Sequence, residues 1–339
     1  EVIGDLTATV SEALIARAQS APKDEFAEML GVATGHTEAP EDPRLARLLP
    51  NFEREGERNF IMQVVCEATQ SAHVPVKVAA FENLVRIMQL YYDKMRFYME
   101  QALFGLTVLG MRDPEPKVAL QAVEFWSTVC DEEIELSLEA AEALEFNEEP
   151  THVSYHFAQI ALPEIAPVLM ELLTVQDEDS DEDEWDTAKA AGTFLGLLAQ
   201  VVGDQIVSLA VPFIEGNIKS PDWRRRDAAL MCFGSIMDGP ESSLLMTLVT
   251  QALPTVLETL HDSSAAVKDT TAWTLGRMCE FVHDAITPDM HLGALIHALL
   301  GSLHDEPRIV THSCWALINL TEHKGILASL DDPDPPTTA

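Results

Sequence analysis

The chain has 339 residues, of which 56 are acidic and 21 are lysine or arginine, and its formal net charge is −35. So large an acidic excess argues against binding to nucleic acid, because a protein needs rows of lysine and arginine to displace counterions from phosphates. It favours basic proteins or peptides as partners, held by an attraction that weakens in salt.

The five cysteines are scattered through apolar stretches and form no Cys-x-x-Cys pair: Cys66, Cys130, Cys232, Cys279 and Cys314. We therefore expect small buried side chains in a reducing compartment, rather than disulfides or a zinc site. No run has the length of a membrane span and no signal sequence opens the chain, so we expect no membrane insertion. The first residue is Glu, which suggests a fragment of a longer protein.

Apolar residues recur at i, i+3 and i+4 from end to end, which predicts an all-α fold. Residues 1–50 are less regular, with one helical stretch at 6–19, and we assign them to a partial or irregular repeat. Helix pairs follow near 55–90, 93–130, 153–203, 205–238, 243–282 and 290–322. The tail 324–339 ends in DDPDPPTTA, which is typical of a disordered linker.

The helices repeat with a period of 42 residues in the second half of the chain. Gly234 aligns with Gly276, and Trp273 aligns with Trp315. A column of basic residues recurs as well, at Lys77, Lys117, Lys189, Arg226 and Lys268. Only the step from Lys117 to Lys189 is much longer, and we divide its surplus between a linker at 139–149 and an acidic segment.

Each period contains two helices. The first carries a proline a few residues in, as in 161–173, 209–220 and 252–262, which is consistent with a kink or a helix start. Asp222, Asp262 and Asp305 lie near the start of the second helix, where a carboxylate can cap free amides. Two helices per roughly 40 residues is typical of HEAT or armadillo arrays. We predict a right-handed α-solenoid of about six HEAT pairs over 51–323, with second helices lining its inner face, as in such arrays generally.

The segment 176–186, QDEDSDEDEWD, interrupts the helices with eight acidic residues in its last ten positions and one tryptophan. Such a block repels itself and stays solvated. The chemistry that it suits is capture of a cationic partner. A calcium site is the alternative, but the segment lacks the glycine turn and the terminal glutamate of a calcium-binding loop.

Several stretches between residues 51 and 323 carry a family resemblance. They are ERNFIMQVVCEAT, LYYDKM, VEFWSTVCDEE, DEDSDEDEWD, IKSPDWRRRDAA, DTTAWTLGRMCE and EPRIVTHSCWAL. The chain resembles the importin-β (karyopherin-β) family of HEAT-repeat nuclear import receptors. The resemblance implies a middle part of such a receptor. Residues 1–50 depart from the family pattern apart from SEALIARAQ at 11–19.

The resemblance implies that the inner face binds the basic importin-β-binding helix of the adaptor importin-α, or another basic cargo signal. The implied contacts are Asp177, Glu178, Asp179, Asp181, Glu182, Asp183, Glu184, Trp185, Trp273, Trp315, Glu124 and Asp131. A tryptophan face attracts arginine or lysine by roughly 0.5–2 kcal/mol, and an exposed carboxylate adds roughly 0.2–1 kcal/mol. Plain core packing is the alternative role for the tryptophans.

The resemblance further implies that the outer face binds Phe-Gly repeats of nucleoporins in shallow apolar slots between adjacent first helices. Two slots are implied: Phe60, Ile61 and Glu57 with Leu14 and Ile15 opposite, and Tyr98 with Leu106. A core role is the alternative for each of these residues. Burying one Phe ring contributes roughly 1.5–3 kcal/mol, so weak multivalent contacts are expected.

The small GTPase Ran, in its GTP form, touches the acidic loop in this family and releases the cargo. The resemblance places Asp181, Glu182 and Asp183 at that contact. We expect weak Ran binding, because the main Ran surface lies in N-terminal repeats that this chain lacks. The resemblance also implies shuttling between cytoplasm and nucleus through the nuclear pore complex.

Two other function classes compete. An enzyme is disfavoured by the lack of a glycine-rich phosphate loop, a Gly-x-Ser-x-Gly elbow or Cys/His metal spacing, and we expect no cofactor. His152 and His156 could share a helix face as metal ligands, with Glu148 and Glu149 nearby, but solvated loop histidines are the simpler interpretation. Another HEAT scaffold, of phosphatase or condensin type, would have the same fold and differ only in its surface residues.

Overall fold

The computed structural model describes residues 52–176 and 186–323, which form helices and no strand. This part of the chain divides into two compact units. The first unit holds residues 52–132 and 151–155, and the second holds 133–150, 156–176 and 186–323. The predictions made for 1–50 and 324–339 lie outside the described residues.

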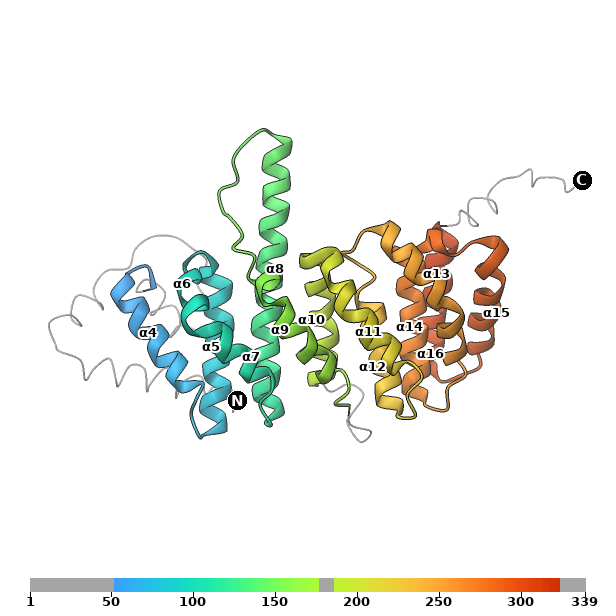
Figure 1. Cartoon of the computed structure of the whole chain (residues 1–339), viewed down its shortest axis with the longest axis horizontal. Helices are drawn as coiled ribbons and strands as arrows, with labels where there is room; N and C mark the ends of the chain where they lie inside the picture. Colours follow the sequence, from blue (N-terminus) through green and yellow to red (C-terminus); the bar gives the residue numbers. More distant parts are fainter. Residues whose placement is uncertain (1–51, 177–185, 324–339) are drawn as a thin grey trace, which may run out of the picture. The chain divides into compact units, whose positions relative to one another are not determined.

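The first unit forms the helix pairs predicted near 55–90 and 93–130 (Figure 1). Its elements are α4 (Glu55–Ala68), α5 (Val74–Tyr91), η1 (Tyr92–Lys94), α6 (Arg96–Tyr98), η2 (Met99–Leu103), α7 (Phe104–Met111) and α8 (Pro116–Glu145) as far as residue 132. Gly110 lets α7 approach α5 and α8, because a side chain there would overlap the Phe81 ring and touch Ala122. Phe81, Phe125 and Trp126 are fully buried and form the core of this unit.

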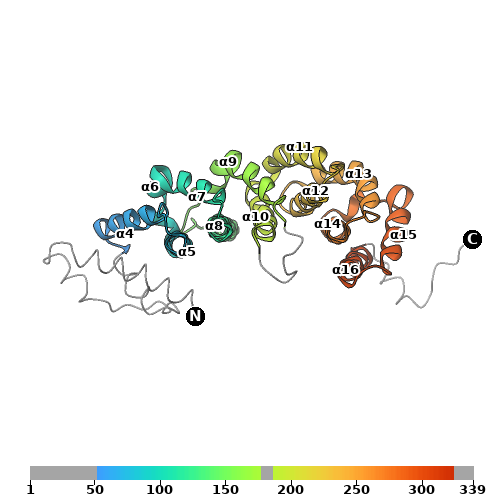
Figure 2. The same ribbon diagram turned by 90° about the horizontal axis from the view of Figure 1, so that it is seen from below.

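The second unit stacks its helices in two rows (Figure 2). Its elements are α9 (Phe157–Leu172), α10 (Thr187–Val202), η3 (Gly203–Ile206), α11 (Val207–Asn217), α12 (Trp223–Ser235), α13 (Ser242–Thr259), α14 (Ala265–Phe281), η4 (His283–Ala285), η5 (Pro288–Leu292), α15 (Gly293–Ser302) and α16 (Pro307–His323). One row holds α9, α11, α13 and α15, and the other holds α10, α12, α14 and α16. Successive members of the second row contact one another. The predicted helix pairs and the α-solenoid of HEAT type are confirmed.

Ion pairs join one second helix to the turn of the next repeat. Lys77 pairs with Asp113 in the first unit. In the second unit Arg226 binds both carboxylate oxygens of Asp262, each at 2.7 Å. Lys268 pairs with Asp305 at 2.6 Å. Three members of the predicted basic column therefore join neighbouring repeats through ion pairs.

The predicted helix caps are found in two forms. Asp222 caps α12 directly, because its carboxylate accepts a hydrogen bond from the Arg224 amide at 3.1 Å. Asp262 lies two residues before the N-cap Ser264 and accepts from the amide of that residue at 2.8 Å. Burial opposes ionisation of Asp262, but its bonds to Arg226 and Ser264 outweigh burial and hold its pKa below the ordinary value.

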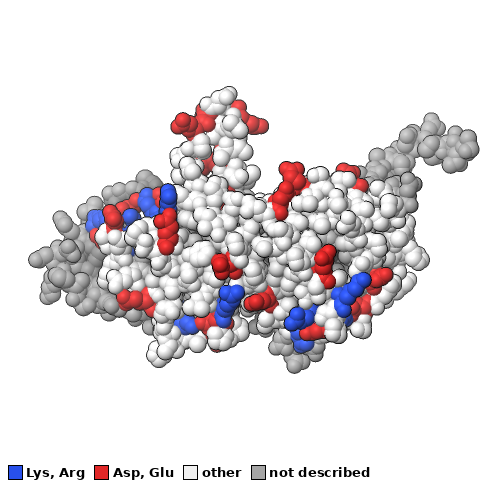
Figure 3. Space-filling model, viewed as in Figure 1, with Lys and Arg blue, Asp and Glu red and all other residues white. Residues whose placement is uncertain are grey.

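Helix α8 is longer than predicted. We expected a linker at 139–149, but α8 continues to Glu145 because this stretch is rich in Ala, Glu and Leu, which are strong helix formers. Asn147, at φ 55°, ends the helix in a left-handed turn, and the Glu148 amide donates to the Ala143 carbonyl at 2.8 Å. This end of α8 carries exposed apolar side chains. It also carries acids, which are red in Figure 3.

A buried carboxylate on α8 positions the start of α9. Glu133 is 3% exposed and accepts hydrogen bonds from the amides of Phe157 at 2.5 Å and Ala158 at 3.3 Å. His156 precedes these amides in a left-handed conformation, at φ 56°. His152 and His156 therefore lie in the irregular segment before α9, as expected for loop histidines, and the alternative that they share a helix face is wrong.

The prediction that no run reaches the length of a membrane span requires a correction. Residues Thr187–Asn217 pass a test of length and composition for such a span. Gly203, at φ 58°, divides this stretch into α10 of 16 residues and α11 of 11 residues. Phe194, Leu195 and Leu198 of α10 are fully buried in the core of the second unit.

Candidate functional site

A row of large side chains runs across the second helices of the second unit. Trp273 on α14 lies against Gly234 of α12, and Trp315 on α16 lies against Gly276 of α14. A side chain at either glycine would overlap the indole ring that covers it. The glycines are therefore required for the close approach of each ring to the preceding helix.

Hydrogen bonds fix the rotation of these helices about their axes. Four residues after each tryptophan, a side chain donates a hydrogen bond to the backbone carbonyl of the glycine that the tryptophan covers. Arg277 Nε donates to the Gly234 oxygen and Asn319 Nδ2 to the Gly276 oxygen, both at 3.3 Å. Trp315 follows Trp273 by 42 residues, and Gly276 follows Gly234 by 42 residues. Both indoles therefore leave equivalent positions of their helices and pack against the equivalent glycine.

The row extends to α12 with a methionine. Met231 covers Gly192 of α10, and Ser235 Oγ donates to the Gly192 oxygen at 3.1 Å. Gly192 precedes Gly234 by the same 42 residues, so Lys189 stands in the column of Met231. The prediction that Lys189 continues the column of Arg226 is therefore wrong, because α10 begins late. Lys189 pairs at 4.0 Å with Asp186, which caps its own helix.

The two tryptophans are half-buried, and the ring of each packs against the glycine of the preceding helix. Trp126 is different, since it is fully buried in the first unit. Half-burial suits a role in recognition, because the packed edge orients a ring whose face remains available. Trp223, at the start of α12, is also half-buried and carries the Arg224 guanidinium 4.9 Å from its ring centre.

Acidic side chains flank the tryptophan row on both sides. Asp269, one turn before Trp273 on α14, contacts His312 Nδ1 at 2.8 Å and Arg308 at 3.5 Å. Glu280, two turns after Trp273, pairs with Arg277 at 3.7 Å. Glu322 holds the position equivalent to Glu280 on α16 and is exposed. A cation that lay along the row would meet carboxylates on either side of it.

The acidic segment itself lies outside the described residues, so the structure does not place Asp177, Glu178, Asp179, Asp181, Glu182, Asp183, Glu184 or Trp185. Its two flanking residues are described. Asp186 accepts from the Lys189 amide at 2.8 Å. The side-chain amide of Gln176 donates to the Leu173 carbonyl at 3.1 Å and also to Asp227. The backbone carbonyl of Gln176 accepts from Arg224 Nε at 2.9 Å. Both ends of the segment are thus fixed to second-row helices.

The two remaining acids predicted for the inner face belong to the first unit. Glu124 and Asp131 are exposed on α8 and lie seven residues apart, on one side of the helix. Partial burial, and then the negative charge of Asp131, raise the pKa of Glu124 above its ordinary value. A cationic ligand beside the pair would lower that pKa again.

The residues predicted for Phe-Gly binding lie on first helices of the first unit. Phe60 is 36% exposed and Ile61 is half-buried on α4. Tyr98 is buried and its hydroxyl donates a hydrogen bond to Asn59 of α4. This bond links α6, which carries Tyr98 of the second predicted slot, to α4, which carries Phe60 and Ile61 of the first. Glu57 and Leu106 are half-buried, and Leu14 and Ile15 lie outside the described residues.

Sequence reasoning missed Phe97. This side chain is 60% exposed at the start of α6, and its ring meets the Tyr98 ring edge to face with centroids 5.4 Å apart. An apolar residue at the start of a predicted first helix was the available signal. With Phe60 it gives this face two exposed aromatic rings.

The cysteines and histidines give no sign of a metal centre. Cys130, Cys232 and Cys279 are buried as predicted, and burial raises the pKa of the Cys232 thiol to about 12. Cys66 is half-buried and Cys314 is exposed on α16, so the prediction of burial is wrong for Cys314. No group of three metal-ligating side chains occurs in residues 52–176 and 186–323.

Comparisons with known proteins identify relatives over most of the chain. The chain is 55% identical over 273 residues to importin subunit beta-1 of Schizosaccharomyces pombe, covering 80% of this chain and 32% of that protein. It is 43% identical over 317 residues to importin subunit beta-1 of Saccharomyces cerevisiae, covering 94% of this chain and 36% of that protein. The chain thus spans about a third of the length of these relatives. A family model described as HEAT-like repeat matches residues 223–278, and one described as a domain of unknown function (DUF2017) matches residues 1–69.

Solved structures give the same result. Yeast importin-beta (Kap95p) superposes with a TM-score of 0.79 at 42% identity, covering 88% of this chain and 35% of that one. A Kap95:Nup1 complex gives a TM-score of 0.78 at 42% identity, covering 88% and 37%. A structure of Kap95p with RanGDP gives 0.78 at 40% identity, covering 93% and 39%.

Proposed function

Because the chain belongs to the importin-β family, we propose that it is the part of a nuclear import receptor that binds the cargo adaptor. The chain spans about a third of the length of its relatives. Its ligand on the second-row helices is the basic importin-β-binding helix of importin-α or a similar basic cargo signal. In this proposal the protein acts by binding, without catalysis or a cofactor, and shuttles between cytoplasm and nucleus.

The observation that carries this proposal is the tryptophan row. Trp273 and Trp315 lie on equivalent positions of α14 and α16, held in the same orientation by Gly234 and Gly276. Half-buried indoles at equivalent positions, with carboxylates on either side, match a helix that carries cations along one side. Core packing alone would not require two large rings to remain half exposed.

Titration with an arginine-rich helical peptide tests this function. Replacing Trp273 and Trp315 by Ala removes both cation–π faces, and at roughly 0.5–2 kcal/mol each we expect affinity to fall about fivefold to several hundredfold. Phe97→Ala removes an exposed aromatic ring of the first unit and serves as the matched control. Equal affinities for the double variant and the control, both folded by circular dichroism, would exclude the tryptophan row as the binding site.

We propose a second binding surface on the first helices of the first unit, for Phe-Gly repeats of nucleoporins. Phe60 and Phe97 are exposed there, on α4 and α6, and Tyr98 joins these helices. The Kap95:Nup1 complex among the structural neighbours supports this class of partner. Retention on beads that carry Phe-Gly peptides should fall when Phe60 and Phe97 are both replaced by Ala, whereas retention that persists would refute the assignment.

Ran in its GTP form is the third proposed partner, at Asp181, Glu182 and Asp183 of the acidic segment. The structure of Kap95p with RanGDP among the neighbours supports Ran as a partner of the family. We expect weak binding by this chain alone. A pull-down in which it retains Ran-GTP as well as a full-length importin-β does would refute that expectation. The family relationship also favours the import-receptor function over that of a phosphatase-type or condensin-type HEAT scaffold.

A further inference from the structure

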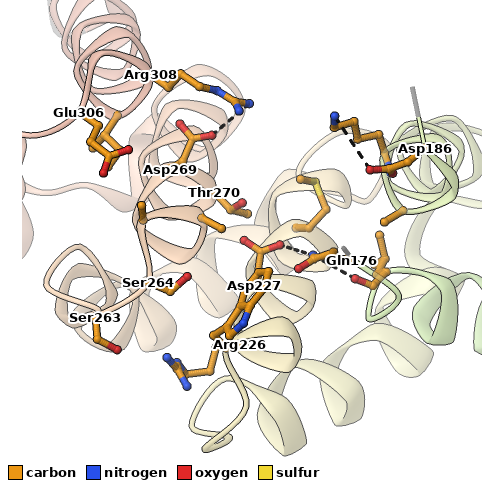
Figure 4. A pocket seen from close by; sticks show the side chains of 18 of the residues that line it. Gln176, Asp186, Arg226, Asp227, Ser263, Ser264, Asp269, Thr270, Glu306 and Arg308 are labelled. Carbon is orange, nitrogen blue, oxygen red and sulfur yellow. Dashed lines mark hydrogen bonds and ion pairs between the residues drawn. The ribbon is translucent and has the colours of Figure 1, made fainter. Parts of the chain in front are cut away.

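A buried carboxyl group on α12 meets a side-chain amide at the end of α9. Asp227 of α12 is 4% exposed and lines a groove of about 750 Å³ beside the N-terminal ends of α10, α12, α14 and α16 (Figure 4). Gln176 lies just beyond α9, and its side-chain amide donates a hydrogen bond to Asp227 Oδ2. Figure 4 shows the two side chains joined in this way. The contact therefore attaches the end of a first-row helix to a second-row helix.

Two acceptor atoms of this contact have no hydrogen-bond partner among the described residues. They are Oδ1 of Asp227 and Oε1 of Gln176, and both are buried. The orientation of the amide follows from its other bond, because its nitrogen also donates to the Leu173 carbonyl at 3.1 Å. The reverse orientation would place the amide oxygen against two further acceptors. Buried polar atoms are nearly always paired, so a donor between the two groups is missing.

The charged side chains around the groove do not supply that donor. Within the described ranges, each cation of the wall pairs with another carboxylate: Arg226 with Asp262 at 2.7 Å, Arg308 with Asp269 at 3.5 Å and Lys189 with Asp186 at 4.0 Å. The other charged groups nearby are Glu306 of the wall and Arg224, whose Nε binds the Gln176 backbone carbonyl. Burial, and then the charges of Asp269 and Asp262, raise the pKa of Asp227 to about 6. These surroundings favour a proton on Asp227 itself.

A proton on Asp227 would satisfy both unpaired atoms at once. A protonated carboxyl group has one O–H donor, and an amide oxygen is an acceptor. Asp227 Oδ1 would then donate to Gln176 Oε1, while Asp227 Oδ2 continues to accept from the amide nitrogen. The two planar groups would form a cyclic pair with two hydrogen bonds. The neutral carboxyl group therefore binds the amide better than the ionised one, which leaves both acceptors buried and unpaired.

We propose that Asp227 and Gln176 form a proton-dependent lock between the end of α9 and α12, closed by two hydrogen bonds when Asp227 is protonated and by one when it is ionised. The lock needs no ligand and goes beyond the proposed function. Opening separates Gln176 from α12 and exposes Asp227 to water, where a carboxyl group has a pKa of about 3.9. The closed form, with a pKa of about 6, binds the proton more tightly. The added stability is fully present below about pH 4 and is lost as the pH rises through about 6.

Hydrogen exchange in the full chain tests the lock. The amides of Thr174 and Val175 report on it, because they bond to backbone carbonyls in the turn that carries Gln176. We correct their protection for the intrinsic effect of pH on exchange. It should fall about tenfold between pH 5 and pH 7.5, as the two pKa values require. Equal protection at the two pH values would overturn the lock.

Two variants show whether the pH effect comes from Asp227. Asp227→Asn places a permanent N–H donor where the proton would be, so protection at pH 7.5 should stay near the wild-type value at pH 5. Glu215→Gln, at an exposed position of α11, makes the same change of net charge and should follow the wild type. An Asp227→Asn variant with the pH dependence of the wild type would refute the proposal.

A double-mutant cycle separates the pair from burial alone. Gln176→Met removes the amide and keeps most of its volume. The gain in protection from Asp227→Asn at pH 7.5 should be at least about threefold smaller in the Gln176→Met background, because the new donor has lost its acceptor. Equal gains in both backgrounds would mean that burial acts alone, and the lock would be wrong.

The side-chain amide resonances of Gln176 give a measurement that needs no change at this residue. Their chemical shifts in the wild type should titrate with a midpoint near pH 6 and should not titrate in Asp227→Asn. This result decides the question if Gln176→Met fails to fold. Resonances that ignore pH in the wild type, or that titrate equally in Asp227→Asn, would exclude a proton shared between the two groups.

Discussion

Asp227 shows how a single buried carboxylate makes the stability of the fold depend on pH. Burial raises its pKa to about 6, and the neighbouring Thr270 and Gln176 offset only part of that rise. A carboxyl group in the unfolded chain has a pKa of about 3.9. The folded chain therefore binds the proton more tightly, and the stabilisation that protonation gives is lost as pH rises from about 4 to about 6.

We predict that Asp227→Asn raises the free energy of unfolding at pH 7 by about 1–3 kcal/mol. The gain should shrink below pH 6 and disappear below about pH 4, where the carboxyl group is protonated in both states. Urea titrations at several pH values measure this difference. A variant less stable than the wild type at pH 7 would contradict it.

Gly276 is a second residue with a specific local role. Gly276→Ala places a methyl group in the Trp315 ring, and we predict a loss of about 1–3 kcal/mol in the free energy of unfolding. Gly216→Ala in α11 is the matched control, because nothing lies within 4 Å of the new methyl group. It should be neutral or stabilising by up to about 1 kcal/mol, since alanine favours helices. Thermal denaturation of both variants measures the contrast, and equal midpoints would refute it.

Helix α9 depends on an acceptor that belongs to another helix. Glu133→Ala leaves the Phe157 and Ala158 amides without their buried partner. We predict a loss of about 2–3 kcal/mol in the free energy of unfolding. Glu133→Gln keeps one acceptor oxygen and should restore part of this loss. Denaturation followed by circular dichroism separates the two, and an Ala variant as stable as the Gln variant would show that the amides find other partners.

The ion pairs between repeats act at the level of neighbouring hairpins. Arg226→Met breaks the two contacts with Asp262, and we predict a cost of about 1–3 kcal/mol. Arg225→Met makes the same substitution at the adjacent, exposed position and should change the free energy of unfolding by less than about 0.5 kcal/mol. Urea denaturation at pH 7 gives both values, and similar losses for the two variants would contradict the assignment.

At the scale of helices and helix pairs, most elements were predictable from sequence and a few were not. The 42-residue period predicted the helix pairs of the second unit and the common column of Trp273 and Trp315. It could not predict that α8 runs on to Glu145, because a solvated helix rich in Ala and Glu has no apolar stripe to mark its end. Lys189 was misplaced because the basic column was followed through the acidic segment, where α10 begins late.

At the scale of the whole chain, positive charge is distributed unevenly. No lysine or arginine occurs between Lys117 and Lys189, although Glu124, Asp131 and the acidic segment lie in this stretch. The acidic segment could be singled out because its charge is visible in the sequence, whereas Glu124 and Asp131 were assigned from the family resemblance. The raised pKa of Asp227 could not be predicted, because the burial of a carboxylate is known only when the groups around it are known.

The central claim is that one chain carries two separate binding faces, one for cationic helices and one for Phe-Gly repeats. The most direct test measures an arginine-rich helical peptide and a Phe-Gly peptide against two double variants, Trp273→Ala with Trp315→Ala and Phe60→Ala with Phe97→Ala. We predict that the first variant loses only the basic peptide, with a salt-dependent affinity in the wild type, and that the second loses only the Phe-Gly peptide. Loss of both ligands in either folded variant, or of neither, would contradict the account.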